Sequence, residues 1–408
     1  MAGYWHRRGR VAGAPRSSGA AMARSQLLGL GLLLWPMLSL LLQLAASPPA
    51  AWLQGRHLLD RVRRTSRASG GRTAATAAYS PVLGLPTGEP GRFDGLALGG
   101  VWVEPPAEGT TDAWRMLYHG RGEGAEEDVV KLSMGCIGEA RSDDGLTWTR
   151  VDGPLAGGAA FAPSAGADGF DSALVGMGSL WGERLYYFGG SGEAVQLGPR
   201  ALRGVRQSAG VAFRTATGGW AERRQALATG PPGSWDDLFV ASPQVIQHGP
   251  GDWRMYYHGA GSAAGDRRFR IGLAVSEDGV SWQRRGLLLG PGPEGAWDAG
   301  GCSRRHVFRL GGGGGYAMLY EGTSVDGRHG IGLALSSDGL TWRRDSAEPV
   351  FRPSDEVGAW DAKVVSAPHF VPRLGGGLLY YVGMSKEGET AVGVAREEGG
   401  DLRTFRRL

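Results

Sequence analysis

The chain has little of what metal and redox sites are usually built from. It holds two cysteines, Cys136 and Cys302, in distant parts of the sequence, and eight histidines with no HxH or HExxH grouping. Zinc sites and disulfide frameworks need closely spaced ligands, so neither is indicated, and we expect both cysteines to be free thiols. A Walker phosphate loop and a GxSxG nucleophile elbow are also missing. The sequence therefore predicts no metal site.

Long helical periods are missing between residues 80 and 408. The chain includes 72 glycines without a strict triplet period, which excludes a collagen-like structure and is typical of a β protein with many turns. Short apolar runs in this region alternate large and small residues, as half-buried strands do. We therefore predict an all-β structure.

Acidic residues are almost missing from the first 72 positions. This segment contains eleven arginines, no lysine and one acid, Asp60, whereas the whole chain has a formal net charge of +4. The basic character thus belongs to this segment, and the rest of the chain carries a net negative charge. A nucleic-acid partner is not predicted, because such binding needs a basic patch on the folded part.

The N-terminal 79 residues are predicted to be a targeting segment. Residues 27–46 form an apolar run that is long enough to span a bilayer, although Pro36 and Gln43 interrupt it. An Arg-, Ser- and Ala-rich stretch follows, as in organelle transit peptides. Two readings stay open: a plastid (chloroplast) leader, or a secretory signal or membrane anchor. Membrane contact is expected only through this run, and only if it is not cleaved.

One unit recurs five times after this segment. It opens with an aromatic residue followed by aspartate, at Phe93-Asp94, Phe170-Asp171, Trp235-Asp236, Trp297-Asp298 and Trp360-Asp361. An aromatic strand follows in each copy: WRMLYHG (114–120), ERLYYFGG (183–190), WRMYYHG (253–259), YAMLYEG (316–322) and LLYYVG (378–383). Repeats of this length indicate a solenoid or a propeller. Each copy divides into four short strands, so residues 80–408 are predicted to form a five-bladed β-propeller, with residues 80–92 adding an outer strand to the last blade.

Three copies also contain a Ser-x-Asp-Gly-x-x-Trp hairpin. The sequences are SDDGLTW (142–148), SEDGVSW (276–282) and SSDGLTW (336–342), and they are similar to the Asp-box turns of sialidases, one residue shorter. Ser and Asp can satisfy the backbone amides of the turn, while the tryptophan packs between neighbouring sheets. These hairpins are interpreted as structural.

Together these features resemble the five-bladed glycosyl hydrolase propellers. This is the arabinanase, levansucrase and invertase superfamily, glycoside hydrolase families 43, 32 and 68, with the mannoside phosphorylases nearby. The resemblance implies carbohydrate as the partner, an axial pocket, and hydrolysis or phosphorolysis of a glycosidic bond. It also implies three carboxylates on the inner strands of the first three blades. That triad does not carry over: Glu104 is the one acid on the five inner strands, and Ala241 stands where the family has its third-blade glutamate.

Other residues are therefore the candidates for the axial site. We predict Glu321, Asp94 and Asp171 as catalytic residues, because Glu321 breaks the repeat and the opening aspartates precede the inner strands. Glu321 is expected to have a raised pKa and to donate a proton. The predicted substrate-binding residues are Asp236, Asp298, Asp361, Arg305, His306, His119 and His258. The alternative for the aspartates is a loop-capping role, and for the cations (Arg304, Arg305, His306) it is a salt bridge with such an aspartate.

Two functions remain open on the sequence. The first is a glycosyl hydrolase-like enzyme that acts on a carbohydrate in the axial pocket. The second is a propeller that binds carbohydrate or protein and has lost catalysis. No cofactor is predicted, although a bridging calcium ion at the axis is compatible with the fold. Convergence of two carboxyl groups in the pocket separates the two functions.

Overall fold

The computed structural model describes residues 79–408, apart from 86–88, 90, 108, 123–129, 132–134, 167, 198–199 and 263–265. The predicted targeting segment 1–79, with its apolar run 27–46, lies outside the described residues except for Tyr79. In the part of the chain that is described, no helix has the length and apolar character needed to cross a bilayer. Cys136 and Cys302 are buried free thiols, as expected.

The described chain is all-β and consists mainly of four-stranded antiparallel sets of strands. Two short 3₁₀ turns, η1 (Ala156–Gly158) and η2 (Gly311–Gly313), lie between them. The sets are, in chain order, β1 (Ala97–Glu104), β2 (Trp114–Arg121), β4 (Gly135–Ser142) and β5 (Thr149–Val151); β6 (Leu174–Trp181), β7 (Arg184–Gly190), β10 (Gln207–Arg214) and β11 (Trp220–Leu227); β12 (Phe239–Gly249), β13 (Asp252–Ala260), β14 (Arg270–Ser276) and β15 (Gln283–Leu289); β16 (Gly301–Arg309), β17 (Tyr316–Thr323), β18 (His329–Ser336) and β19 (Arg343–Arg344); and β20 (Val364–Val371), β21 (Leu378–Met384), β22 (Thr390–Glu398) and β23 (Thr404–Arg407).

Two further pairings complete the sheets. A single parallel pair, Gln207 with Phe239, joins the second and third sets into one eight-stranded sheet. A small separate sheet combines β3 (Val130–Lys131), β9 (Arg200–Arg203) and β8 (Val195–Leu197). It links the loop after β2 to the insertion between β7 and β10.

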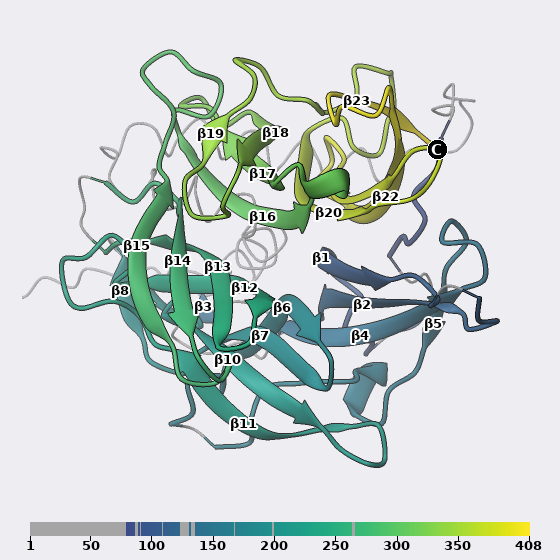
Figure 1. Ribbon diagram of the computed structural model, residues 1–408. Helices are drawn as coiled ribbons and strands as arrows, with labels where there is room; N and C mark the ends of the chain where they lie inside the picture. The colour runs from purple at the N-terminus through teal and green to yellow at the C-terminus, as the bar shows by residue number, and fades with distance from the viewer. Residues whose placement is uncertain are drawn as a thin grey trace, which may run out of the picture.

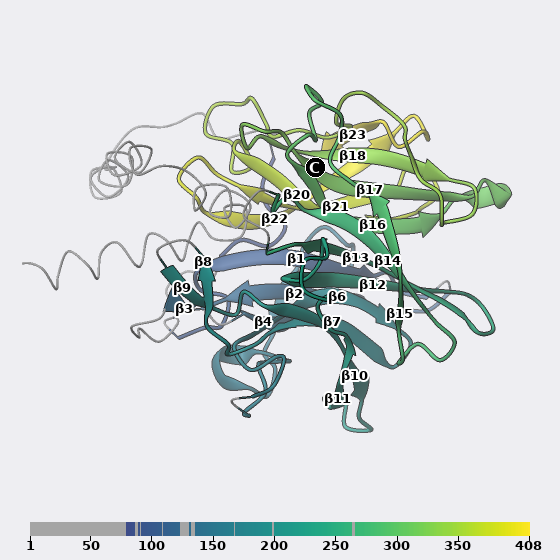
Figure 2. The ribbon, with the colours of Figure 1, turned by 90° about the vertical axis from the view of Figure 1, so that its left-hand side faces the viewer.

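The first strand of each set faces the middle of the molecule. Strand β1 contacts β6 and β20, β6 contacts β12, β12 contacts β16, and β16 contacts β20, so the five first strands form a closed ring. Figure 1 shows them around the centre, with β5, β11, β15, β19 and β23 towards the outside. Figure 2, turned by 90°, shows the small β3-β9-β8 sheet at one end of the ring. The arrangement is that of a β-propeller.

The same polar network holds all five opening aspartates. Each is almost fully buried and accepts a hydrogen bond from a tyrosine hydroxyl of its second strand, in the pairs Asp94–Tyr118, Asp171–Tyr187, Asp236–Tyr257, Asp298–Tyr320 and Asp361–Tyr381. An arginine from the fourth strand also donates to each of them: Arg150, Arg223, Arg284, Arg344 and Arg407. The same arginines donate to a backbone carbonyl of the segment that leads into the aspartate. The aspartates therefore fasten each connection to its sheet.

The N-terminal part of the described chain is attached to the last sheet. Leu83 makes an isolated antiparallel bridge to Val392 of β22, and the Tyr79 hydroxyl donates to Asp361 Oδ1 at 2.6 Å. Two other isolated antiparallel bridges have the same form, Phe351 with Ile331 and Phe161 with Ile137. Phe351 and Phe161 lie in segments that connect consecutive sheets. Residues near Leu83 thus connect the last sheet to the first. Of the expected outer strand over 80–92, the described residues form this one bridge, and β23 occupies the outer position of the last set.

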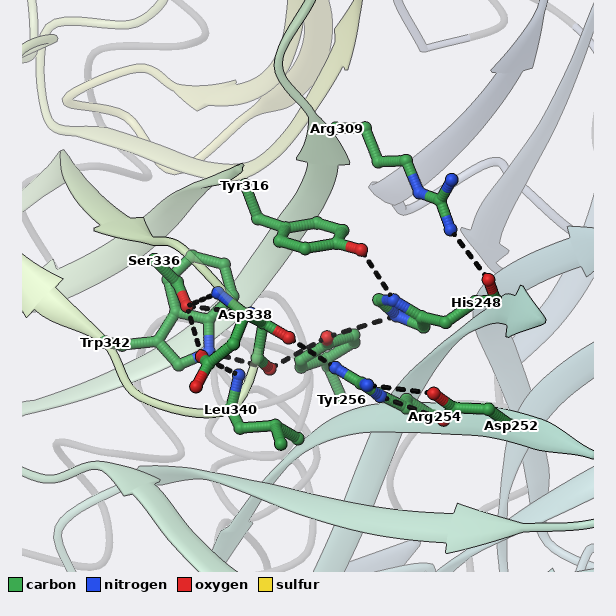
Figure 3. Close-up of polar contacts among 11 residues, drawn as sticks. His248, Asp252, Arg254, Tyr256, Arg309, Tyr316, Ser336, Asp338, Leu340 and Trp342 are labelled. Carbon is green, nitrogen blue, oxygen red and sulfur yellow. Dashed lines mark hydrogen bonds and ion pairs between the residues drawn. The ribbon is translucent and has the colours of Figure 1, made fainter. Parts of the chain in front are cut away.

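Neighbouring sheets are also joined through the Ser-x-Asp-Gly-x-x-Trp hairpins. In each hairpin the serine and aspartate accept backbone N–H groups, which confirms a structural role. A tyrosine from a different set donates to the glycine carbonyl: Tyr186 to Gly279, Tyr256 to Gly339, and Tyr380 to Gly145, at 2.7–3.0 Å. Figure 3 shows Tyr256 beside the hairpin of Ser336 and Trp342. We call these three hydrogen bonds the tyrosine clamps.

The clamps follow a rule that is visible in the sequence. Leu117 and Leu319 occupy the position of the clamp tyrosine in the first and fourth sets. The sets that follow these two, with β11 and β23 as outer strands, lack the hairpin motif. A tyrosine is therefore present where the next set offers a hairpin carbonyl, and leucine where it does not. This fits the rule that a buried hydroxyl needs a partner.

Removing one clamp hydroxyl is expected to weaken the fold. Tyr256→Phe deletes the donor to Gly339 O while it keeps the ring, so we expect a loss of about 1 kcal/mol in the free energy of unfolding, the typical net contribution of a buried hydrogen bond. Trp342 Nε1 still donates to the same carbonyl at 3.2 Å, which limits the loss. Urea unfolding measures the effect. An unchanged midpoint would show that the clamp adds no stability.

Candidate functional site

A small cavity lies beside the first strands of the first, fourth and fifth sets. Its polar lining residues are His119, Arg121, Arg304, Glu321, Ser366 and Thr390. The apolar lining comes from the starts of β1 and β20 and the end of β21, and includes Leu98, Val364 and Val382. Because the lining combines strands from three sets, the cavity lies where the ring of first strands converges. We call it the axial cavity.

Arg304 lies in a break of the strand register. The pairing of β16 with β17 shifts between Cys302 and Arg305, so Ser303 and Arg304 form a bulge. The other four first strands have a register shift near the same level. In β12 and β20 the shift coincides with positive φ angles at Ser242 (47°) and Ala367 (48°), each followed by proline. Bulges of this kind redirect side chains and are common near binding sites.

Glu321 lines the cavity and is held by a hydrogen bond with His329. Its Oε1 lies 2.9 Å from His329 Nδ1, and both side chains are buried. Burial favours the neutral acid, but the His329 hydrogen bond and the Arg304 guanidinium outweigh it and hold the pKa of Glu321 below its usual range. The expected raised pKa is therefore wrong: Glu321 is ionised at neutral pH and is not poised to donate a proton.

His119 and Arg121 line the cavity from β2. The Arg121 Nε–H group donates to His119 Nε2 at 3.2 Å, so this ring nitrogen is unprotonated. Burial, together with the Arg121 and Arg304 charges, keeps the pKa of His119 well below its usual value. Burial also lowers the pKa of Arg121 to about 9, with a further contribution from Arg304. His119 is thus neutral and Arg121 is charged at neutral pH.

Arg305 and His258 lie towards the third set, and neither is among the residues that line the axial cavity. Arg305 Nη2 donates to the carbonyl oxygens of Ser242 and Tyr256. Within the described chain, the Arg305 Nε and Nη1 atoms and the His258 Nδ1 atom are buried without a hydrogen-bond partner. Burial lowers the pKa of Arg305 to about 9, and burial with the Arg305 charge keeps the pKa of His258 well below its usual value.

His306 does not reach the axial cavity. Its Nδ1 accepts the backbone N–H of Phe370 at 2.9 Å, and its ring packs against His369 and Trp102. Similar bridges join other first strands, from Gln244 to Val307 and from His369 to Val103. His306 thus belongs to a layer of side chains that connects the first strands. The expectation that it faces a water-filled pocket does not fit this geometry.

The five opening aspartates do not line the axial cavity. Asp94 accepts from Tyr118, from Arg150 and also from Arg92. Burial opposes its ionisation, but the Arg150 and Arg92 hydrogen bonds hold the pKa of Asp94 below its usual range. The structure therefore agrees with the alternative to a catalytic or substrate-binding role, in which the aspartates fasten loops. This holds equally for Asp94, Asp171, Asp236, Asp298 and Asp361. The described hydrogen bonds of Arg305 go to the carbonyl oxygens of Ser242 and Tyr256, which differs from the alternative of a salt bridge with such an aspartate.

Sequence reasoning missed part of the cavity. Arg121 was not selected, although it breaks the repeat: the matching positions are Gly190, Ala260, Thr323 and Met384. His329 breaks it in the same way at the start of the third strand, where the matching positions are Gly135, Gln207, Phe269 and Thr390. Comparison of the copies position by position would have found both.

Glu321 is the one carboxylate in the described lining of the cavity. Hydrolysis by the two-carboxylate mechanism needs a second carboxyl about 5–5.5 Å away for retention or about 6.5–9.5 Å for inversion. Among the described residues there is also no group of three or more His, Cys, Asp or Glu side chains that could hold a metal ion. The cavity therefore offers one anionic group, two guanidinium groups and two hydroxyl groups.

No protein-family model matches the chain. A search of curated proteins likewise found no match. Solved structures do match. One described as a glycoside hydrolase has a TM-score of 0.58 at 16% identity, over 83% of this chain and 94% of that chain. A thermostable family-43 glycoside hydrolase has a TM-score of 0.54 at 13% identity, over 76% and 92%. The β-1,2-mannobiose phosphorylase from Listeria innocua has a TM-score of 0.52 at 16% identity, over 77% and 94%.

The chain has the fold of the β-propeller glycoside hydrolases. At these identities the likeness concerns the fold, and activity has to be argued from the site. In this propeller the axial cavity is formed at the converging first strands.

Proposed function

We propose that the chain is a carbohydrate-active, five-bladed β-propeller that holds a sugar in the axial cavity. Five sets of four strands, and a closed ring of their first strands, support the blade number. The axial position of the cavity supports its role, because side chains from several blades meet a small ligand there. Similar structures described as glycoside hydrolases and as a mannobiose phosphorylase favour carbohydrate as the ligand.

The observation that carries the proposal is the ionised Glu321 in this cavity. A buried carboxylate beside a bound sugar can accept a proton from an attacking oxygen, or stabilise positive charge at the anomeric carbon. His329 holds the Glu321 carboxylate through Oε1, and Arg304 keeps it charged. Glu321 is thus suited to activate a nucleophile. The attacking oxygen can belong to water, which gives hydrolysis, or to phosphate, which gives phosphorolysis.

A second candidate is a propeller that binds carbohydrate without cleaving it. It is favoured by the single carboxylate in the described lining, because hydrolysis by the two-carboxylate mechanism requires a pair. It is also favoured by the hydrogen bond between Glu321 and His329, which occupies one oxygen of that carboxylate.

Incubation of the protein with a panel of glycosides tests the proposal. Furanosides and mannosides, including β-1,2-mannobiose, are offered with and without inorganic phosphate, and the products are separated by chromatography. Free sugar without phosphate identifies a hydrolase, and sugar 1-phosphate that forms only with phosphate identifies a phosphorylase. Saturation-transfer NMR with the same compounds reports binding. Binding without turnover supports the second candidate, and neither binding nor turnover would overturn both.

A further inference from the structure

The fifth set lines the axial cavity with aliphatic side chains. Val364 lies at the start of β20, and Val382 and Met384 lie at the end of β21. These three residues are 2–5% exposed, and we call them the aliphatic lining. The ionisable side chains of the described lining come from the first and fourth sets: His119, Arg121, Arg304 and Glu321. The two kinds of side chain therefore come from different sets.

The aliphatic lining is a departure from the repeat. At the position of Val382 the first set has His119 and the fourth has Glu321. At the position of Met384 the first set has Arg121. The shared fold thus accepts polar side chains at both places and does not itself require aliphatic ones. Departures from a shared pattern are expected where a protein serves a function of its own.

Aliphatic side chains select against a hydroxyl group of a ligand. They offer it no hydrogen bond in exchange for those that it makes with water, whereas a methyl group in the same place gains from burial. The described lining contains no Trp, Tyr or Phe, the flat rings that would stack on the C–H face of a sugar. The aliphatic lining is therefore better suited to a small apolar substituent than to the face of a sugar ring.

We infer that the aliphatic lining selects a sugar that carries a methyl group, from a 6-deoxy carbon or from an N-acetyl group. This inference rests on the proposed function, since it names the class of sugar that the axial cavity takes. The methyl group packs against Val364, Val382 and Met384, and the hydroxyl groups of the ring face the polar lining. Thr390 Oγ1 accepts the Leu98 N–H at 2.7 Å, and it can donate its own hydrogen to a ligand oxygen.

Titration calorimetry with matched pairs of sugars tests this inference. D-rhamnose and D-mannose differ by one hydroxyl group on carbon 6, as do L-fucose and L-galactose. N-acetylglucosamine and glucose form the third pair. We expect the methyl-bearing member of a pair to bind about 10–100-fold more tightly, the range over which an apolar pocket rejects an added hydroxyl group. A preference in the first two pairs identifies the 6-deoxy carbon as the source, and one in the third pair identifies the N-acetyl group.

Two variants locate the methyl group, and Val371→Thr is the matched control. Val364→Thr keeps the branched shape but adds a hydroxyl group to the aliphatic lining, so it is expected to lower the preference about tenfold. Val382→Thr makes the same change from β21 and keeps the test decisive should Val364→Thr fail to fold. Val371 is on the same strand as Val364, is equally buried at 4% exposure and lies outside the described lining. Its variant should keep the native preference.

The outcomes separate this inference from the proposed function. Equal affinity within all three pairs would overturn the inference, and cleavage of hexosides by the same protein would then leave the proposed function intact. A preference that is unchanged in both Val364→Thr and Val382→Thr would place the methyl group elsewhere and would also overturn the inference. No binding of any sugar would overturn the inference and the proposed function together.

Discussion

Asp94→Ala is expected to destabilise the protein by about 3–5 kcal/mol, the typical cost of removing one partner of a buried ion pair. Asp94 is fully buried and accepts from Tyr118 at 3.0 Å, Arg150 at 2.7 Å and Arg92 at 3.0 Å. Its removal leaves a buried tyrosine hydroxyl and two guanidinium groups without their carboxylate. The free energy of unfolding from urea titration measures the loss.

Asp152→Ala is the matched control for this change. Asp152 is largely exposed and pairs at 3.0 Å with the same Arg92 side chain that contacts Asp94. Surface ion pairs contribute about 0–1 kcal/mol, so a small change is expected. A catalytic Asp94 would behave in the opposite way, with normal stability and lost turnover. That result would restore the sequence-based assignment and contradict the loop-fastening role.

The pH dependence of this contribution follows from the Asp94 pKa. Burial opposes ionisation, but Arg150 and Arg92 together keep the folded-state pKa below the ordinary value. A carboxylate with a depressed pKa stabilises the fold above its unfolded-state pKa and loses this effect as the pH falls through the folded-state value. The difference in the free energy of unfolding between the native protein and Asp94→Ala is thus largest at neutral pH and becomes smaller in acid.

The fold could be predicted from the sequence because the signal occurs five times. The aromatic-Asp opening, the second strand and the hairpin motif each depend on local geometry, and the sheets occur where these copies indicated. The same repetition explains why the predicted aspartates lie outside the lining of the axial cavity. A residue that is present in all five units serves what all five units share, which here is the connection fastened by tyrosine and arginine.

The candidate site could be predicted only in part. Glu321 was predicted because it breaks the repeat, and it lines the axial cavity together with His119, which occupies the matching position in the first copy. His306 breaks it too, yet lies in the layer that joins the first strands. His306 and the cavity-lining Arg304 have different surroundings because of the bulge at Ser303 and Arg304, which changes the direction in which nearby residues of one strand point. Spacing in the sequence does not reveal such a shift.

Glu321→Gln is expected to lower turnover of any glycoside that the protein cleaves by about 10²–10⁴-fold, the usual contribution of a group that transfers a proton. Gln keeps the shape of the side chain but neither carries a charge nor accepts a proton from a nucleophile. Glu104→Gln is the matched control, because Glu104 is the one acid on the five first strands, is partly exposed beside Arg115 and does not line the cavity. It should leave turnover unchanged.

Stability measured beside turnover separates two roles of Glu321, which is buried in the lining of the axial cavity. Lost turnover in Glu321→Gln, with an unfolding midpoint equal to that of the native protein, would place the carboxylate in the chemistry. Lost turnover together with a lower unfolding midpoint would mean that Glu321 holds the cavity in shape instead of taking part in the chemistry. Full turnover in Glu321→Gln would remove it from the reaction.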